Sequence, residues 1–377
     1  METQRKKAFS LLESVKRDPV LFASFLLATA SAFLVPPSAA YLAYLDIRVL
    51  CLLLSLMLVV AGLKEAGLFH WMVDKLLRLV HSTRALSVAL TCVCFFSSML
   101  ITNDVALITF VPLSILLLTE TGKHSLLIPV IVLQTIAANL GSMLTPLGNP
   151  QNLYLYSVSG MAVSDFLLTM AFPTLISLLL LLAACCLMKN ETIPVPEEKS
   201  SPLGFQRILP WILLFILCLL TVAHLVHYLL VLAIVIAAVL LLNRHLLAKA
   251  DYGLLLTFIF FFIFIGNLKN VPAVNSFFSQ LVNGRELTIG ILLSQVISNV
   301  PAAMLLSGFT QSYKSLLVGV NLGGLGTLIA SMASLISYKL YAATEQPKMG
   351  TYMAIFTGLN LLFLAILWPL TALLMPI

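Results

Sequence analysis

The stretch SMLITNDVA, residues 98–106, lies at the centre of an apolar run that extends over residues 85–118. As one straight helix this run would be about 51 Å long, whereas the hydrocarbon core of a bilayer is about 30 Å thick. Thr102, Asn103 and Asp104 in its middle are residue types that cap helices and form turns. We therefore expect two helical arms that meet at these polar residues.

A related stretch, SQVISNVPA at residues 294–302, lies in the apolar run between Arg285 and Lys314. Two full crossings would need about 40 residues, which is more than this run contains. One straight crossing would place Pro301 inside a helix, where proline costs about 3 kcal/mol or more. A re-entrant hairpin over residues 287–312, with its polar tip near the midplane, avoids both problems, and by analogy we expect a second one over residues 85–118.

The composition of the whole chain predicts that lipid is its main environment. Of its 377 residues, 60% are hydrophobic and 10% are charged, whereas soluble domains contain about 25% charged residues. The mean hydropathy is +1.06. We expect an all-α integral membrane protein with about ten spans. The net charge of +6 predicts no nucleic-acid partner, because Lys and Arg gather on the cytoplasmic loops of membrane proteins.

The distribution of Lys and Arg also predicts the topology. With the N-terminus inside and each hairpin returning to its own side, 17 of the 21 Lys and Arg residues are cytoplasmic. We therefore expect a multi-pass protein of the inner or plasma membrane, with a cytoplasmic N-terminus and an external C-terminus. This count does not distinguish a hairpin from a pair of full spans, since both return to the same side.

The two halves of the chain resemble each other. SMLITN at 98–103 aligns with SQVISN at 294–299, and further along LGS at 140–142 aligns with LGT at 325–327. Because the topology places the two hairpins on opposite sides, we expect inverted-topology repeats, as in many secondary transporters. The expected domains are 1–45 (N-terminal cytoplasmic segment and first span), 46–188 (repeat 1, with hairpin 85–118 and broken helix 126–157), 189–208 (cytoplasmic linker), 209–250 (connecting spans) and 251–377 (repeat 2, with hairpin 287–312 and broken helix 316–343).

The helix breaks predict the binding site, because irregular backbone at membrane depth must be buried in protein or line a wet cavity. Two breaks are the tips, and two more are TPLGNPQN at 145–152 and ASMAS at 330–334. Helix N-termini at a break favour anions, and the side-chain oxygens there are ligands for Na⁺. The candidate solute- or ion-binding residues are Thr102, Asn103, Asp104, Gly148, Asn149, Asn152, Ser298, Asn299, Ser331 and Ser334.

Asp104 is the acidic residue placed deep in an apolar run, where a charge is costly and is by default a functional candidate. It would carry a proton or bind Na⁺, and a sodium site could include Thr102, Asn103, Asp104 and Asn149. Helix capping is the competing interpretation of these residues. The six cysteines show no paired C-x-x-C spacing. His224 and His227 would supply two ligands at most, so we expect no metal cofactor and no other cofactor.

The motifs TNDVA at 102–106, GNPQN at 148–152, GGLGT at 323–327 and ASMAS at 330–334 resemble the ion transporter superfamily. The similarity covers about 45–345 and concerns the arsenite-permease, sodium–proton antiporter and citrate-transporter-like branches. In the related divalent-anion/sodium symporters, Ser-Asn-Thr at both tips binds sodium and substrate. Thr102-Asn103 and Ser298-Asn299 match that pattern, whereas Asp104 and Val300 replace its threonine, so a single-site or proton-coupled scheme stays open. The resemblance also implies that two copies can pair as a homodimer.

These observations together predict a secondary active transporter that moves a small, anionic solute, an inorganic or organic ion, by alternating access coupled to H⁺ or Na⁺. A cation–proton antiporter with Asp104 as exchanger is the nearest alternative, and a passive channel is a further one. We do not expect an enzyme, because intramembrane aspartyl proteolysis needs two acidic residues at membrane depth and only Asp104 qualifies. No intramembrane Ser–His pair or His-Glu-x-x-His motif is present either.

Overall fold

The computed structural model describes residues 19–77, 80, 82–192 and 204–375, and it is helical throughout, with one isolated β-bridge between Ser82 and Thr192. Within these residues, eight helices are long and apolar enough to cross a membrane. The prediction of a multi-pass, all-helical protein is therefore confirmed for the described chain. The first 18 residues of the predicted segment 1–45, and 193–203 of the predicted linker, lie outside the described residues.

The chain divides into two compact units, and each unit takes residues from both halves of the sequence. The division follows spatial grouping, so the predicted repeat boundaries stay a prediction. Unit 1 comprises Met1–Gly62, Trp211–Asn283 and Met304–Thr310. Unit 2 comprises Leu63–Pro210, Gly284–Ala303 and Gln311–Ile377.

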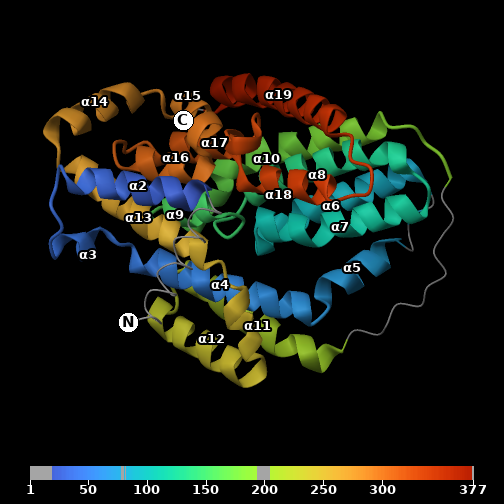
Figure 1. Cartoon of the computed structure of the whole chain (residues 1–377), viewed down its shortest axis with the longest axis horizontal. Helices are drawn as coiled ribbons and strands as arrows, with labels where there is room; N and C mark the ends of the chain where they lie inside the picture. Colours follow the sequence, from blue (N-terminus) through green and yellow to red (C-terminus); the bar gives the residue numbers. More distant parts are fainter. Residues whose placement is uncertain (1–18, 78–79, 81, 193–203, 376–377) are drawn as a thin grey trace. The chain divides into compact units, whose positions relative to one another are not determined.

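Unit 1 is built from helices that alternate between long apolar spans and short connecting elements. Its described elements are α2 (Pro19–Ala32), α3 (Ala40–Tyr44), α4 (Ile47–Glu65), α11 (Phe205–Val222), α12 (Tyr228–Leu242), η2 (Arg244–Lys249), α13 (Tyr252–Lys269) and α14 (Pro272–Val282), of which α4 and α11 extend past the unit's limits. Helices α2 and α13 lie side by side (Figure 1). Asn267 on α13 ties this pair together, because its Nδ2 donates to Ser31 Oγ at 3.0 Å and to Tyr41 OH at 2.9 Å.

Unit 2 contains the remaining helices, including all four predicted breaks. Its described elements are α5 (Leu68–Leu77), α6 (Thr83–Ile101), α7 (Asn103–Glu120), η1 (His124–Leu126), α8 (Leu127–Ser142), α9 (Pro150–Ser159), α10 (Val163–Cys186), α15 (Glu286–Ile297), the start of α16 (Asn299–Ser307), α17 (Tyr313–Leu322), η3 (Leu328–Ala330), α18 (Met332–Ala342) and α19 (Met349–Leu374).

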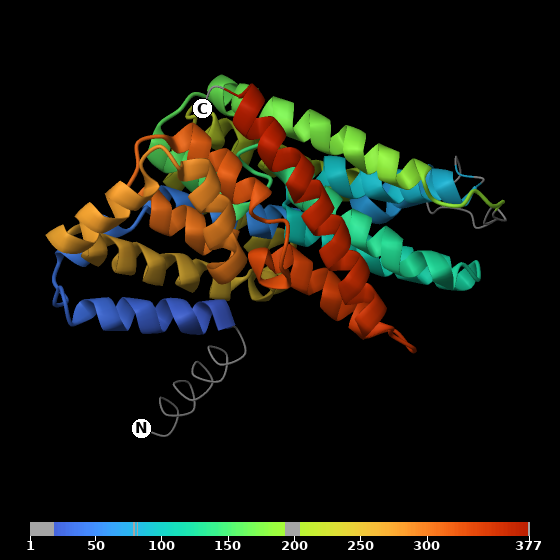
Figure 2. The same ribbon diagram turned by 90° about the horizontal axis from the view of Figure 1, so that it is seen from above.

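Helix α8 forms the centre of unit 2. Nearly all of its residues are buried, and it packs against α6, α7, α10, α18 and α19. Apolar residues are distributed around the whole circumference of this helix, which is typical of a fully buried helix. Figure 2 shows α19, drawn in red, running obliquely across the other helices of this unit. Asn139, near the end of α8, is therefore placed inside the unit rather than toward lipid.

Both predicted tips are helix breaks of a single residue. Helix α6 ends at Ile101 and α7 begins at Asn103, and α15 ends at Ile297 and α16 begins at Asn299. The helices of the second pair have 12 and 9 residues, fewer than the roughly 20 that a full crossing needs. Those of the first pair have 19 and 18 residues, a length compatible with full spans. The re-entrant character of the hairpins thus stays a prediction.

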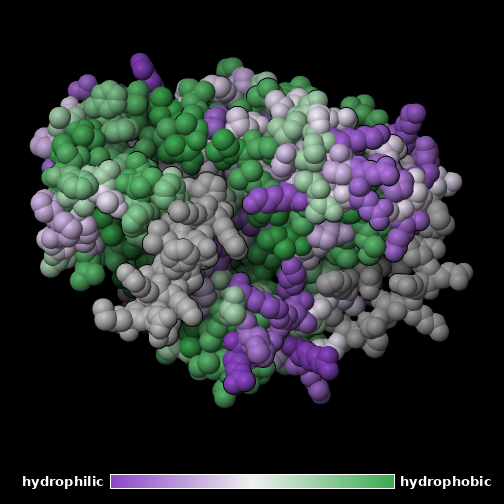
Figure 3. Space-filling model, viewed as in Figure 1, coloured by the Kyte–Doolittle hydropathy of each residue, from purple (hydrophilic) through white to green (hydrophobic). Residues whose placement is uncertain are grey.

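The outer faces of the long helices are apolar, as contact with lipid requires. On α10, Leu168, Leu175 and Leu179 are all more than half exposed, and their spacing places them on one side of the helix. Figure 3 shows long stretches of hydrophobic surface on the face drawn. Such a surface would be a large exposed patch on a soluble protein, so it supports the assignment to a membrane.

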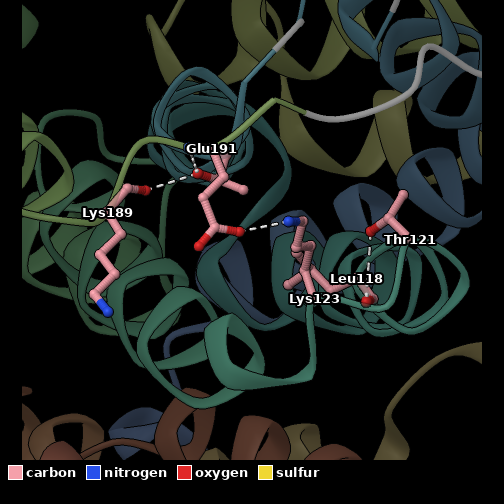
Figure 4. A network of polar contacts seen from close by, with 6 residues as sticks. Leu118, Thr121, Lys123, Lys189 and Glu191 are labelled. Atoms are coloured by element: carbon pink, nitrogen blue, oxygen red, sulfur yellow. Dashed lines mark hydrogen bonds and ion pairs between the residues drawn. The ribbon is translucent and has the colours of Figure 1, made fainter.

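The chain that leaves α10 is fixed to the start of α6. Thr83 is buried, and its N–H donates to Glu191 O at 2.8 Å while its Oγ1 donates to Lys189 O at 2.7 Å. The carboxylate of Glu191 also pairs with the ammonium of Lys123 (Figure 4). The hydrogen bond and the positive charge of Lys123 hold the pKa of Glu191 below its usual value. The described start of the predicted linker is thus part of unit 2.

Candidate functional site in unit 2

The two tips share one backbone conformation. Thr102 has φ 74° and ψ 151°, and Ser298 has φ 74° and ψ 155°. This region is adopted almost only by glycine, and it costs roughly 1–3 kcal/mol for other residues. Strain of this kind gathers at ligand clamps and switch regions. Two strained residues at matching positions therefore mark the tips as candidate functional positions.

Asn103 connects the first tip to two other segments. It is 5% exposed, its N–H donates to Gly148 O at 3.0 Å, and its Nδ2 donates to Asn139 Oδ1 at 3.1 Å. Its own Oδ1 accepts from the N–H of Asp104 at 3.0 Å. Asp104 is partly buried in the first turn of α7, where the positive end of the helix dipole favours a carboxylate.

Ser298 and Asn299 form the second tip, and both are buried. Ser298 Oγ lies 3.5 Å from Asn299 Oδ1 and 3.4 Å from Ala330 O. The Nδ2 of Asn299 lies over Gly324, where an added Cβ would come within 3.0 Å. The second tip thus contacts the second helix interruption, as the first tip contacts the first.

The first interruption separates α8 from α9 and is held by asparagine side chains. Asn149 is the N-cap of α9, and its Oδ1 accepts from the N–H of Asn152 at 2.9 Å. Its Nδ2 donates to Ser142 Oγ at 3.1 Å and to Asn321 Oδ1 at 3.0 Å. Asn152 is fully buried, and its Nδ2 donates at 3.0–3.2 Å to the carbonyls of Ser142, Met143 and Thr145.

Gly148 is required by close packing within this interruption. A Cβ at position 148 would overlap the carbonyl of Ser142. The carbonyl of Gly148 itself accepts from Asn103, and Thr145 Oγ1 donates to Met99 O on the first tip helix. The first interruption therefore lies directly against the first tip.

The second interruption is longer than the sequence predicted. Residues 330–334 were the expected break, but α17 already ends at Leu322 and α18 begins at Met332, with η3 between them. Glycines explain the earlier start, since Gly326 has φ 108° and such a conformation favours glycine. Gln295 holds the loop, because its Nε2 donates to Gly323 O and Leu325 O at 2.9 Å.

Ser331 and Ser334 lie at the start of α18. Ser331 is the N-cap residue, but its hydroxyl donates to Asn139 Oδ1 at 2.9 Å instead of capping the helix. Ser334 is fully buried, and its Oγ has no hydrogen-bond partner among the described residues. The first turn of α18 thus begins without a side-chain cap and beside an unpartnered hydroxyl.

Two residues at the centre of these contacts were not among the candidates. Asn139 and Asn321 are buried in α8 and α17, and each contacts both halves of the chain. Asn321 Nδ2 donates to Asn152 Oδ1 at 2.7 Å. The signal in the sequence was the tripeptide Asn-Leu-Gly, which occurs at 139–141 and again at 321–323, just before each interruption.

The chemistry of the site is that of neutral amides, hydroxyls and helix starts. All ten candidate residues belong to unit 2. No group of three His, Cys, Asp or Glu side chains that could hold a metal occurs among the residues described. In the suggested sodium site, Asn103 Oδ1 and Asn149 Oδ1 each already accept a backbone N–H. A Na⁺ there would use the second lone pair of each oxygen, and the sodium site stays a prediction.

Comparison with known proteins identifies the family. A sequence profile described as citrate transporter matches residues 9–316. An uncharacterized transporter of Methanocaldococcus jannaschii is 34% identical over 283 residues, which cover 74% of this chain and 77% of that protein. An inner membrane protein of Escherichia coli is 32% identical over 338 residues, which cover 87% of this chain and 89% of that protein.

More distant relatives agree with this result. An uncharacterized transporter of Mycobacterium tuberculosis is 24% identical over 285 residues, which cover 68% of this chain and 66% of that protein. The resemblance inferred from the tip and interruption motifs is therefore confirmed at the level of the family. The chain belongs to the citrate transporter family, within the ion transporter superfamily, and it is a multi-pass membrane transporter rather than an enzyme.

Proposed function

We propose that the protein is a secondary active transporter that moves a small anionic solute by alternating access, coupled to H⁺ or Na⁺. The observation that carries this proposal is one connected, buried polar network in which helix starts meet. Asn103 at the start of α7 binds Asn139, which binds Ser331 at the start of α18. Asn149, the cap of α9, belongs to the same region, because Gly148 beside it accepts from Asn103.

An anionic solute fits the charges of this network. Each helix start presents backbone N–H groups and the positive end of a helix dipole, which together favour an anion. The starts of α7, α9, α16 and α18 all lie in unit 2. Among the candidate residues, Asp104 alone carries a carboxylate. Citrate, named by the family, is a triply charged small anion and is the first solute to test.

Equivalent contacts in the two halves support alternating access. Asn139 and Asn321 are 182 residues apart in the sequence, and the two N-cap residues, Asn149 and Ser331, are separated by the same 182 residues. Asn139 contacts the cap of the second half, and Asn321 contacts the cap of the first. The sequence alignment of 140–142 with 325–327 has an offset of 185 residues, which is three more than this separation. A site built from two equivalent halves is the arrangement that rocking between two states requires.

Coupling to a cation is assigned to the position where the halves differ. Asp104 follows Asn103 at the first tip, and Val300 follows Asn299 at the second. A carboxylate beside an anion site either binds a cation or takes up a proton when the solute binds. Asp104→Asn should therefore leave a transporter that no longer responds to the coupling gradient, and the gradient that loses its effect identifies the ion.

Reconstituted protein tests the proposal directly. Proteoliposomes would be given labelled citrate under an imposed pH gradient, an imposed Na⁺ gradient or neither, with a panel of unlabelled anions as competitors. We expect saturable uptake that one gradient accelerates. Asn103→Ala and Asn299→Ala should each remove uptake while the protein still inserts into membranes. Asn283→Ala, at an exposed asparagine outside unit 2, is the matched control and should transport normally.

Normal uptake by both tip variants would refute the site. Uptake that never saturates and ignores both gradients would instead indicate a passive channel. The cation–proton antiporter is the second candidate, and Asp104 in the first turn of α7 favours it. A pH change inside the vesicles on addition of cations, in buffer without a transportable anion, would establish the antiporter over the anion transporter.

A further inference from the structure

We infer that Asn139 is a positioning residue that fixes the first tip and the start of α18 relative to each other. Its Oδ1 accepts from Asn103 Nδ2 at 3.1 Å and from Ser331 Oγ at 2.9 Å, and its Nδ2 donates to Gly324 O at 3.4 Å. One carboxamide thus joins a residue of the first half to two residues of the second. The consequence of this inference for transport rests on the proposed function, whereas the contacts themselves are independent of it.

The burial of Asn139 makes these contacts obligatory. Asn139 is 3% exposed near the end of α8, the most deeply buried long helix described. A buried carboxamide without hydrogen-bond partners costs about 1–3 kcal/mol. The side chain of Asn139 must therefore either move together with its partners or keep them in place. Helix α8 packs on several neighbours, which makes it a rigid base. The strained tip at Thr102 and the uncapped start of α18 are therefore the members that Asn139 holds in place.

Asn321 is the counterpart of Asn139, but its partners differ. Its Oδ1 accepts from Asn149 Nδ2 at 3.0 Å, and its Nδ2 donates to Asn152 Oδ1 at 2.7 Å and to Leu317 O at 2.8 Å. No hydrogen bond among the described contacts joins Asn321 to Asn299. Asn139 thus reaches a tip, whereas Asn321 reaches only an interruption.

This difference gives Asn139 a distinct role. A solute or ion that binds at Asn103 competes with Asn139 Oδ1 for the side-chain amide of Asn103. The same oxygen then has only Ser331 as donor, so binding at the first tip changes the environment of the start of α18. The coupling runs through one atom, Oδ1 of Asn139, and among the described residues no equivalent atom binds the second tip.

Hydrogen–deuterium exchange of the full-length protein, measured by mass spectrometry without any solute, tests the positioning role. Asn139→Leu should accelerate exchange about five- to tenfold in both 102–107 and 331–336, as the loss of one hydrogen bond at each site predicts. Asn321→Leu, the matched control, should accelerate exchange in 149–155 and leave 102–107 as in the unmodified protein. Equal acceleration of all peptides in both variants, or no change in 102–107 in Asn139→Leu, would overturn the inference.

A conservative variant separates positioning from simple packing. Asn139→Asp keeps the shape and the acceptor oxygen but loses the donor to Gly324 O. It should restore slow exchange in 102–107 and 331–336, and it also serves if Asn139→Leu does not fold. Fast exchange in both segments of Asn139→Asp would show that the acceptor oxygen does not hold them, and it would overturn the positioning role.

Citrate uptake by the same variants separates this inference from the proposed function. If the unmodified protein takes up neither citrate nor any competitor anion while the exchange pattern is as expected, the proposed function fails and the positioning role stands. If uptake is normal in Asn139→Leu despite faster exchange at both segments, the positioning role has no consequence for transport, and the inference fails instead.

Discussion

Replacing Asn152 by alanine should destabilise unit 2 more than most single substitutions, because this side chain holds the whole first interruption. Its Nδ2 donates to three carbonyls at 3.0–3.2 Å, and its Oδ1 accepts from Asn321 at 2.7 Å. The two N–H bonds of the amide are shared among the three carbonyls, so the substitution removes about three hydrogen bonds. The carbonyls belong to the last residue of α8 and to the chain that follows it, where the regular helical hydrogen bonds end.

The number of hydrogen bonds lost in Asn152→Ala determines the size of the destabilisation. Hydrogen bonds inside membrane proteins contribute about 0.6 kcal/mol on average, and those in water-soluble proteins about 1 kcal/mol. Three bonds therefore amount to about 2–3 kcal/mol. For a unit of this size, 1 kcal/mol shifts Tm by roughly 2–4 °C, so Asn152→Ala should lower the apparent Tm by about 4–12 °C.

Scanning fluorimetry of purified protein in detergent, at one fixed scan rate, measures this shift. Asn360→Ala is the matched control, since Asn360 is also fully buried but donates one hydrogen bond, to Phe356 O at 2.8 Å. That variant should lose only about 1–4 °C. An Asn152→Ala variant no less stable than Asn360→Ala would refute the view that Asn152 holds the interruption.

Three further predictions address the first tip, unit 1 and the start of the linker. Thr102→Gly relieves roughly 1–3 kcal/mol of backbone strain, and the greater conformational entropy of the unfolded chain costs up to about 1 kcal/mol. The apparent Tm should therefore stay equal or rise, while solute uptake falls. A lower Tm would contradict the view that Thr102 is strained. Arg48 Nη1 lies 2.8 Å from His224 Nδ1, and burial, together with the charge of Arg48, lowers the pKa of His224 below 6.5. The stability that this neutral histidine contributes is present above pH 6.5 and is lost as the pH falls through the lowered pKa, so melting curves from pH 7.5 to 5 should show a decline that His224→Asn reduces. Finally, Thr83→Val should increase proteolysis near residue 191 more than Lys123→Ala does, because Thr83 is buried and its Oγ1 makes two hydrogen bonds there that valine cannot make, whereas an exposed ion pair contributes little.

The positions of the breaks could be predicted because local chemistry determines them. Thr102-Asn103-Asp104 is a capping sequence inside an apolar run, and Pro146, Gly148 and Pro150 cannot all remain in one helix. The second interruption was placed too late, because its break depends on Gly323 and Gly326 rather than on proline. Glycine permits a break without requiring one, and here Gln295 from another helix stabilises the loop.

The function of individual asparagines could not be predicted in the same way. The sequence marks Asn149 and Asn152 as polar residues in a break, and this suggests ligands for an ion. In the structure, Asn149 Oδ1 and Asn152 Nδ2 are occupied by the chain itself. Which partner satisfies a buried amide depends on which helices pack together, and two residues that are 172 positions apart, such as Asn149 and Asn321, share no local signal.

The repeated tripeptide Asn-Leu-Gly nevertheless has a physical meaning that a sequence alone could have suggested. Residues two positions apart on a helix point about 200° apart, on opposite sides. On α8, Gly141 faces α6, where a Cβ would lie 2.7 Å from Ser98 Oγ, and Gly323, directly after α17, faces α15, where a Cβ would lie 2.7 Å from Ser294 Cβ. The asparagine two residues earlier therefore points away from α6 or α15 and binds the interruption of the other half, and Asn139 in addition binds Asn103 at the start of α7. A glycine that admits one helix thus orients the asparagine that binds the other half, and this geometry is why the same three residues precede both breaks.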